Sequence, residues 1–95
     1  MKQNLYTVHD TKANAFLTPF YLPNDGLAIR AMEDCVRDEN HKFNVHAHDF
    51  SLFKLGEYDD QSGKHQMLEA PRNIIQLVTI KSTINENPIP AQPNA

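Results

Sequence analysis

Histidines gather near the middle of the chain, and histidine is a common metal ligand. His46 and His48 form an H-x-H pair that Asp49 follows, and His41 lies upstream. On an extended segment alternate side chains point the same way, so this set could supply four ligands to zinc. The sequence has no cysteine pair and no helical H-x-x-x-H spacing. We therefore predict that these histidines are exposed or cap local turns, and that the protein holds no metal or other cofactor.

Carboxylates gather in a second segment, where Glu57, Asp59 and Asp60 could form an acid/base pair. Hairpin turns favour Asp for local hydrogen bonding, and a polar run that ends in Gly63 is typical of such a turn. The chain has only three glycines, with no serine nucleophile elbow and no phosphate-binding glycine-rich loop. We predict that the protein is not an enzyme and has no catalytic residues.

Aromatic and basic residues lie close together in two segments, a pattern that can bind single-stranded nucleic acid by stacking its bases. The rings considered are Tyr6, Phe16, Phe20, Tyr21, Phe53 and Tyr58. The candidate nucleic-acid-binding residues are Lys12, Tyr21, Arg30, Lys54, Tyr58 and Lys64. The alternative is that the rings form the core of a small sheet. The net charge of −3 favours this alternative, because an acidic chain attracts a phosphate backbone poorly.

Two predicted β-hairpins carry these rings. Strand-forming residues at 5–8 and 16–21 indicate the first hairpin, and Pro19 makes its second strand an edge or breaks it near Thr18. The second hairpin joins a strand at residues 50–58 to a returning strand at 64–68. Gly56 within it indicates a bulge or a close backbone approach.

An amphipathic helix is predicted between the hairpins. Asn24 or Asp25 can cap its first free amides. Its apolar stripe recurs with helical spacing and consists of Leu27, Ala28, Ala31, Met32, Cys35 and Val36. Charged residues such as Arg30 and Glu33 occupy the other face. We expect the stripe to cover one face of the sheet.

The remaining segments are less regular. Residues 38–49 are predicted to be a surface loop pinned by Phe43 or Val45. Residues 71–84 fit either a further strand or a short helix, and the pattern leaves both open.

These elements predict a single α+β domain over residues 1–84, with two β-hairpins in a small antiparallel sheet packed on one helix. The proline-rich residues 85–95 are predicted to form a disordered tail.

Composition indicates a folded domain and the kind of compartment in which it works. The 95 residues are 40% hydrophobic and 22% charged, which is typical of a folded domain. Cys35 has no intramolecular disulfide partner and fits a reducing compartment, and no apolar run approaches the roughly 18 residues of a membrane span. A small core leaves a thin stability margin, so we expect a homo-oligomer. From the cysteine content and the lack of a long apolar run, we expect it in the cytoplasm and not in a membrane.

Two longer segments carry a family resemblance. Residues 15–30 read AFLTPFYLPNDGLAIR, and residues 46–59 read HAHDFSLFKLGEYD before the turn glycine Gly63. In order and spacing they resemble the small nonstructural protein of tailless single-stranded-DNA phages, the gokushovirus branch of the Microviridae. The resemblance spans about residues 4–70. Ala47 departs from the His-Pro that the family often has at this point, and the proline-rich tail is also unusual for it.

The resemblance implies a non-virion protein in the cytoplasm of the infected bacterial host. It would act as a non-enzymatic accessory factor in replication or packaging of a single-stranded DNA genome, with single-stranded DNA as a partner. The alternative is a protein–protein adaptor that contacts host replication machinery or the phage capsid. The acidic charge, the exposed strand edges and the tail favour this alternative. No catalytic residue follows from the resemblance.

Overall fold

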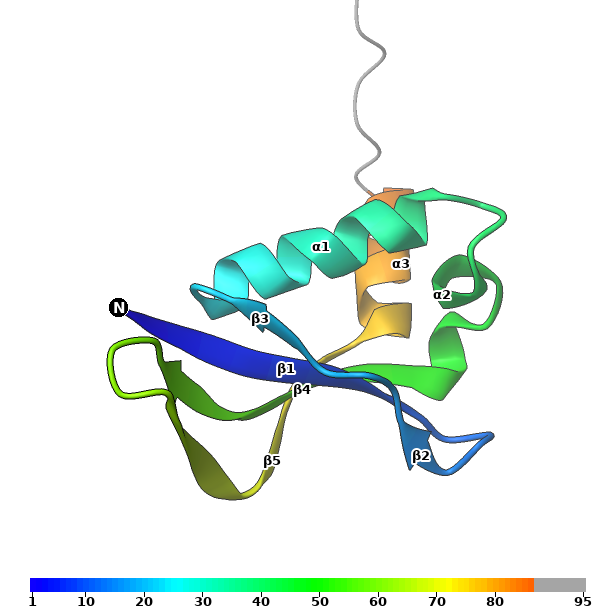
Figure 1. Cartoon of the computed structure of the whole chain (residues 1–95). Coiled ribbons are helices and arrows are strands. Elements are labelled where there is room, and N and C mark those ends of the chain that lie inside the picture. The colour runs from blue at the N-terminus through cyan, green and yellow to red at the C-terminus, as the bar shows by residue number, and fades with distance from the viewer. Residues whose placement is uncertain (87–95) are drawn as a thin grey trace, which may run out of the picture.

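Figure 1 shows the computed structural model of the protein, which describes residues 1–86 and has the predicted α+β architecture. The elements are β1 (Lys2–Asp10), β2 (Ala15–Phe16), β3 (Phe20–Leu22), α1 (Asp25–Arg37), α2 (Lys42–Val45), the 3-10 turn η1 (Ala47–Asp49), β4 (Phe50–Asp59), β5 (Lys64–Gln76) and α3 (Leu77–Glu86). All five strands pair antiparallel in one sheet.

Strand β1 is the centre of the sheet. It pairs with β4 along one edge and with both β2 and β3 along the other, and β5 follows β4. The first hairpin is interrupted between β2 and β3, as Pro19 predicts, because proline has no N–H to donate. Leu17 ties this interruption to β1: its N–H donates to the Val8 carbonyl at 2.8 Å, and its carbonyl accepts from Thr7 Oγ1 at 2.6 Å.

Helix α1 begins where the sequence predicts. Asn24 is its N-cap, and Asn24 Oδ1 accepts a hydrogen bond from the Leu27 N–H at 2.9 Å. From its stripe Ala28, Met32 and Val36 are buried. These side chains pack on the sheet because the stripe repeats with the helical period, so one face of α1 is continuously apolar.

The core lies between the sheet and the helices, all of which are on the same side of the sheet (Figure 1). Its fully buried strand residues include Tyr6 and Leu52, and α3 adds Leu77. Phe43 of α2 closes the core with 7% of its surface exposed, whereas Val45 is 55% exposed. Phe43 is therefore the residue that pins residues 38–49, which contain short helical turns instead of the predicted irregular loop.

Residues 71–84, for which the sequence leaves both strand and helix open, contain the end of a strand and most of a helix. Strand β5 continues past the predicted end at Leu68 as far as Gln76, and α3 then begins at Leu77. Ile75 pairs with Leu52 in the sheet, which explains the continuation.

Helix α3 includes Asn85 and Glu86, the first two residues of the predicted tail. The rest of the predicted tail, residues 87–95, lies outside the described residues. Within residues 1–86, no helix combines the length and the apolar character that a membrane span requires.

Candidate nucleic-acid interface

The face of the sheet opposite the helices carries exposed aromatic rings. The register puts the odd-numbered side chains of β1 on this face. The residues of β2, β3 and β4 that pair with them have their side chains on the same face. We call it the aromatic face and define it by His9, Phe16, Tyr21, Phe53, Tyr58 and His65. Phe16 is 50% exposed and Tyr21 is 47% exposed. Large apolar groups gathered on a surface mark a binding site more often than chance.

The rings of this face form two separate clusters. In the first, the ring centroid of Phe16 lies 4.6 Å from that of His9 and 5.7 Å from that of Phe53. Both contacts are edge-to-face, the arrangement that the ring quadrupoles favour. The cluster joins β2, β1 and β4, so it depends on the pairing of three strands.

The second cluster lies toward the other end of the same strands. The ring centroid of Tyr58 lies 5.5 Å from that of Tyr21 and 4.8 Å from that of His65. The Tyr21 hydroxyl is hydrogen-bonded to His65 Nε2 at 2.6 Å. This bond holds the exposed Tyr21 ring in place across β1 and β4, because it links β3 to β5.

One-residue irregularities put the two clusters on the same face. Phe53 and Tyr58 are five residues apart in β4, and Phe16 and Tyr21 are five apart in the first hairpin. In a regular strand an odd spacing puts side chains on opposite faces. The β1–β4 pairing shifts register beside Leu55, and the interruption at 17–19 adds one residue opposite β1 in the same way. Both shifts restore a common face.

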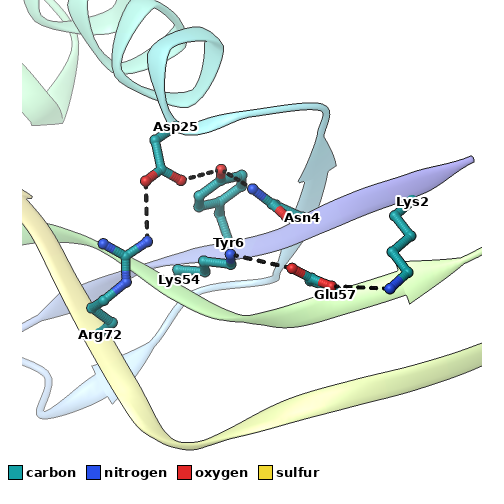
Figure 2. A network of polar contacts seen from close by, with 7 residues as sticks. All are labelled: Lys2, Asn4, Tyr6, Asp25, Lys54, Glu57 and Arg72. Atoms are coloured by element: carbon teal, nitrogen blue, oxygen red, sulfur yellow. Dashed lines mark hydrogen bonds and ion pairs between the residues drawn. The ribbon is translucent and has the colours of Figure 1, made fainter.

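Of the six predicted nucleic-acid-binding residues, the structure brings only Tyr21 and Tyr58 together on the aromatic face. Lys54 is opposite Tyr6 in the β1–β4 pairing and lies on the helix side of the sheet, where only 14% of its side chain is exposed. Its Nζ atom lies 3.8 Å from a carboxylate oxygen of Glu57 (Figure 2). Lys54 is therefore on the opposite face from the rings: it alternates with its neighbour Phe53, and the bulge at Leu55 separates it from Tyr58, four residues along the strand.

The other predicted cations do not gather at the rings. Lys64 is opposite Asp59 in the β4–β5 pairing and lines a hollow with Lys2, and of the aromatic face only His65 also lines this hollow. Lys12 lines a hollow beside α2 with Lys42, and Arg30 is exposed on α1. Lysine and arginine thus contribute little to the aromatic face, which the sequence did not predict.

A polar network on the helix side links β1, α1 and β5 (Figure 2). The Tyr6 hydroxyl donates to Asp25 Oδ1 at 2.6 Å and accepts from Asn4 Nδ2 at 2.9 Å. Arg72 donates to Asp25 Oδ2 at 3.0 Å. Burial, and then the hydrogen bond to Asp25, raises the pKa of Tyr6 to about 12. The hydrogen bond from Tyr6, and then the Arg72 guanidinium, lowers the pKa of Asp25 against the opposing effect of burial.

Asp59 and His41, two of the residues singled out by their spacing, have structural partners. Asp59 Oδ1 accepts from the Gln61 N–H at 2.9 Å, the turn bonding predicted for it, and this bond lowers the pKa of Asp59. His41 Nδ1 accepts from the Phe43 N–H at 2.9 Å and so caps α2, as predicted. His46 and His48 are exposed. Over residues 1–86, no three His, Cys, Asp or Glu side chains gather in a way that could hold a metal ion.

Sequence reasoning missed His9 and His65, and it left Phe16 and Phe53 out of the final set. A usable signal was present in both hairpins: two rings five residues apart, with a residue between them that disrupts a regular strand. Pro19 is that residue in the first hairpin and Gly56 in the second.

Comparisons with known proteins place the chain in a family. Residues 3–80 match the family described as phage ORF5 protein. No curated protein and no solved structure matches the chain. The matched residues include all of the strands except Lys2, together with α1 and both aromatic clusters. Because the match spans most of the sequence, the chain belongs to the phage ORF5 protein family.

Proposed function

We propose that this phage protein binds single-stranded DNA on its aromatic face, as a non-enzymatic accessory factor in genome replication or packaging in the host cytoplasm. The observation that carries the proposal is the pair of exposed ring clusters on the face of the sheet opposite the helices. Exposed rings on strands stack unpaired bases, and each stacked base contributes about 1–3 kcal/mol. The motif resemblance to the gokushovirus nonstructural protein supports a single-stranded genome as the source of such bases.

The distribution of charge predicts how DNA binding should depend on salt. Because Lys12, Arg30 and Lys54 belong to other surfaces than the rings and the net charge is −3, stacking rather than phosphate attraction would supply most of the affinity. The logarithm of the binding constant for a single strand falls with log salt by about 0.7 per neutralised phosphate. With at most two phosphate contacts, we expect a slope shallower than about −1.5.

Fluorescence anisotropy with a labelled oligo(dT), titrated at several salt concentrations, tests this function. We expect binding at low salt, a shallow salt slope and weaker binding to a duplex, whose paired bases cannot stack on protein rings. The double variant Phe16→Ala, Tyr21→Ala should lose most of the affinity, because both rings are about half exposed and belong to the clusters. Arg30→Ala is the matched control on α1 and should bind as the unmodified protein does.

Three results would contradict the proposal: no binding at low salt, equal affinity for the duplex, or full affinity in the double variant. Circular dichroism of each variant separates loss of binding from loss of fold.

A second candidate function is the adaptor role, and the edge of β5 favours it. Met67 is 54% exposed and Leu68 is 40% exposed on this outer strand, which has β4 on only one side. A strand edge of this kind can pair with a strand of another protein. A pulldown from infected cells should recover a phage or host protein with the unmodified chain and lose it with Met67→Glu, Leu68→Glu. Recovery of the same proteins by both would contradict the role.

A further inference from the structure

We infer that the aromatic face holds a single DNA strand at two separate stacking stations, so that its contact length is about five nucleotides. This inference rests on the proposed function and adds the size of the site to it. The first station is the cluster of His9, Phe16 and Phe53, and the second is the cluster of Tyr21, Tyr58 and His65.

The separation of the stations follows from the register. Along β1, the first station is centred beside residue 8, between the positions opposite Phe53 and Phe16. The second is centred beside residue 4, between the positions opposite Tyr58 and Tyr21. Four residues of a strand span about 13 Å. A strand of DNA that keeps its stacked rise of about 3.4 Å per nucleotide needs about four steps to cover this distance.

The surface between the stations has no ring of its own. Leu5 and Thr7 of β1 lie beneath it and are buried, so neither offers a side chain to a bound base, and the Thr7 hydroxyl is already bonded to the Leu17 carbonyl. Gly56, opposite Leu5, has no side chain. Bases in the middle of a bound strand would therefore lack a stacking partner, while the bases near its two ends would each have one.

With two linked stations, the affinity depends on oligonucleotide length in a way that it does not on a uniform surface. A dinucleotide can occupy only one station, whereas a hexanucleotide can reach both. The second stacking contact then becomes intramolecular and adds to the affinity without a second association step. One stacked base is equivalent to about a 5-fold to 150-fold change in affinity.

Competition anisotropy with dT2, dT4, dT6 and dT8 against a labelled oligo(dT) tests the inference. We expect a rise of at least 10-fold between dT2 and dT6, and less than 3-fold between dT6 and dT8. Phe16→Ala and Tyr21→Ala are a matched pair, one for each station, with similar exposure of 50% and 47%. Each alanine variant should abolish the rise in affinity between dT2 and dT6. Its affinity for dT2 should stay within about 3-fold of that of the unmodified protein. Phe16→Tyr and Tyr21→Phe keep the rings and should keep the rise.

The failures of the inference and of the proposed function give different results. If dT8 binds but affinity grows evenly with length, or if one Ala variant keeps the rise, the two-station arrangement is wrong and DNA binding stands. If no oligonucleotide binds at low salt, both are wrong. Sedimentation analysis completes the test: a dimer that Phe16→Ala and Tyr21→Ala both dissociate, with no DNA bound, would identify the face as a contact between copies of the chain and overturn both.

Discussion

Replacement of Gly56 by alanine tests the close approach of β5 to β4 on which the bulge depends. A Cβ atom at this position would lie 2.5 Å from the Gln66 carbonyl oxygen and 2.9 Å from the Met67 Cα atom. Both contacts are with backbone, so no side chain can rotate to relieve them. Non-bonded atoms need about 3.5 Å, which means that β5 must move by about 1 Å.

The cost of this movement follows from two effects. Overpacking a well-packed site costs about 1–3 kcal/mol, and each weakened ladder hydrogen bond costs about 0.5–1.5 kcal/mol. We therefore expect Gly56→Ala to lower the free energy of unfolding by about 2–4 kcal/mol. A domain of this length has about 5–14 kcal/mol in total, so the loss is large. Urea unfolding followed by circular dichroism measures it.

The other two glycines supply matched controls. Gly26→Ala places a Cβ atom 3.4 Å from Asn24 Oδ1 in the first turn of α1, where alanine is favoured over glycine by about 0.5–1 kcal/mol. Gly63→Ala meets open space but has φ of +72°, so it should cost about 1–2 kcal/mol. A loss below 0.5 kcal/mol for Gly56→Ala, or a larger loss for Gly63→Ala, would refute the reasoning.

Two further predictions concern the core. Because the pKa of Tyr6 is raised from 10 to about 12, the folded state keeps a proton that the unfolded chain loses, so the free energy of unfolding should fall between about pH 10 and pH 12. Tyr6→Phe should be less stable at neutral pH but lose less stability over that window; an identical pH profile in urea unfolding would contradict the assignment. Met32→Asp puts a carboxylate at a position with only 5% exposure and should abolish cooperative unfolding, whereas Arg30→Ala on the exposed side should stay within about 0.5 kcal/mol of the unmodified protein. A cooperative transition in Met32→Asp would show that α1 does not cover the core.

The helix and the hairpins could be predicted because local chemistry dictates them. Asn24 caps α1 in the structure, and the buried Ala28, Met32 and Val36 come from the predicted stripe. Gly63 has the positive φ that its turn requires. Residues 71–84 could not be assigned, because apolar β-branched residues suit a buried strand and a buried helix equally well. The pairing of Ile75 with Leu52 settles where the strand continues, and only a tertiary contact could do so.

For the candidate site, the sequence by itself determined which rings are available and which irregular residues, Pro19 and Gly56, lie between them. It also determined the family, because the match depends on residue order alone. Only the tertiary structure decided which rings share a face. Alternation along a regular strand would separate Phe53 from Tyr58, and the single extra residue in the β1–β4 register, Leu55, reunites them and leaves Lys54 on the helix side, away from Tyr58. Side-chain direction in a sheet has a period of two, so one inserted residue reverses every direction beyond it.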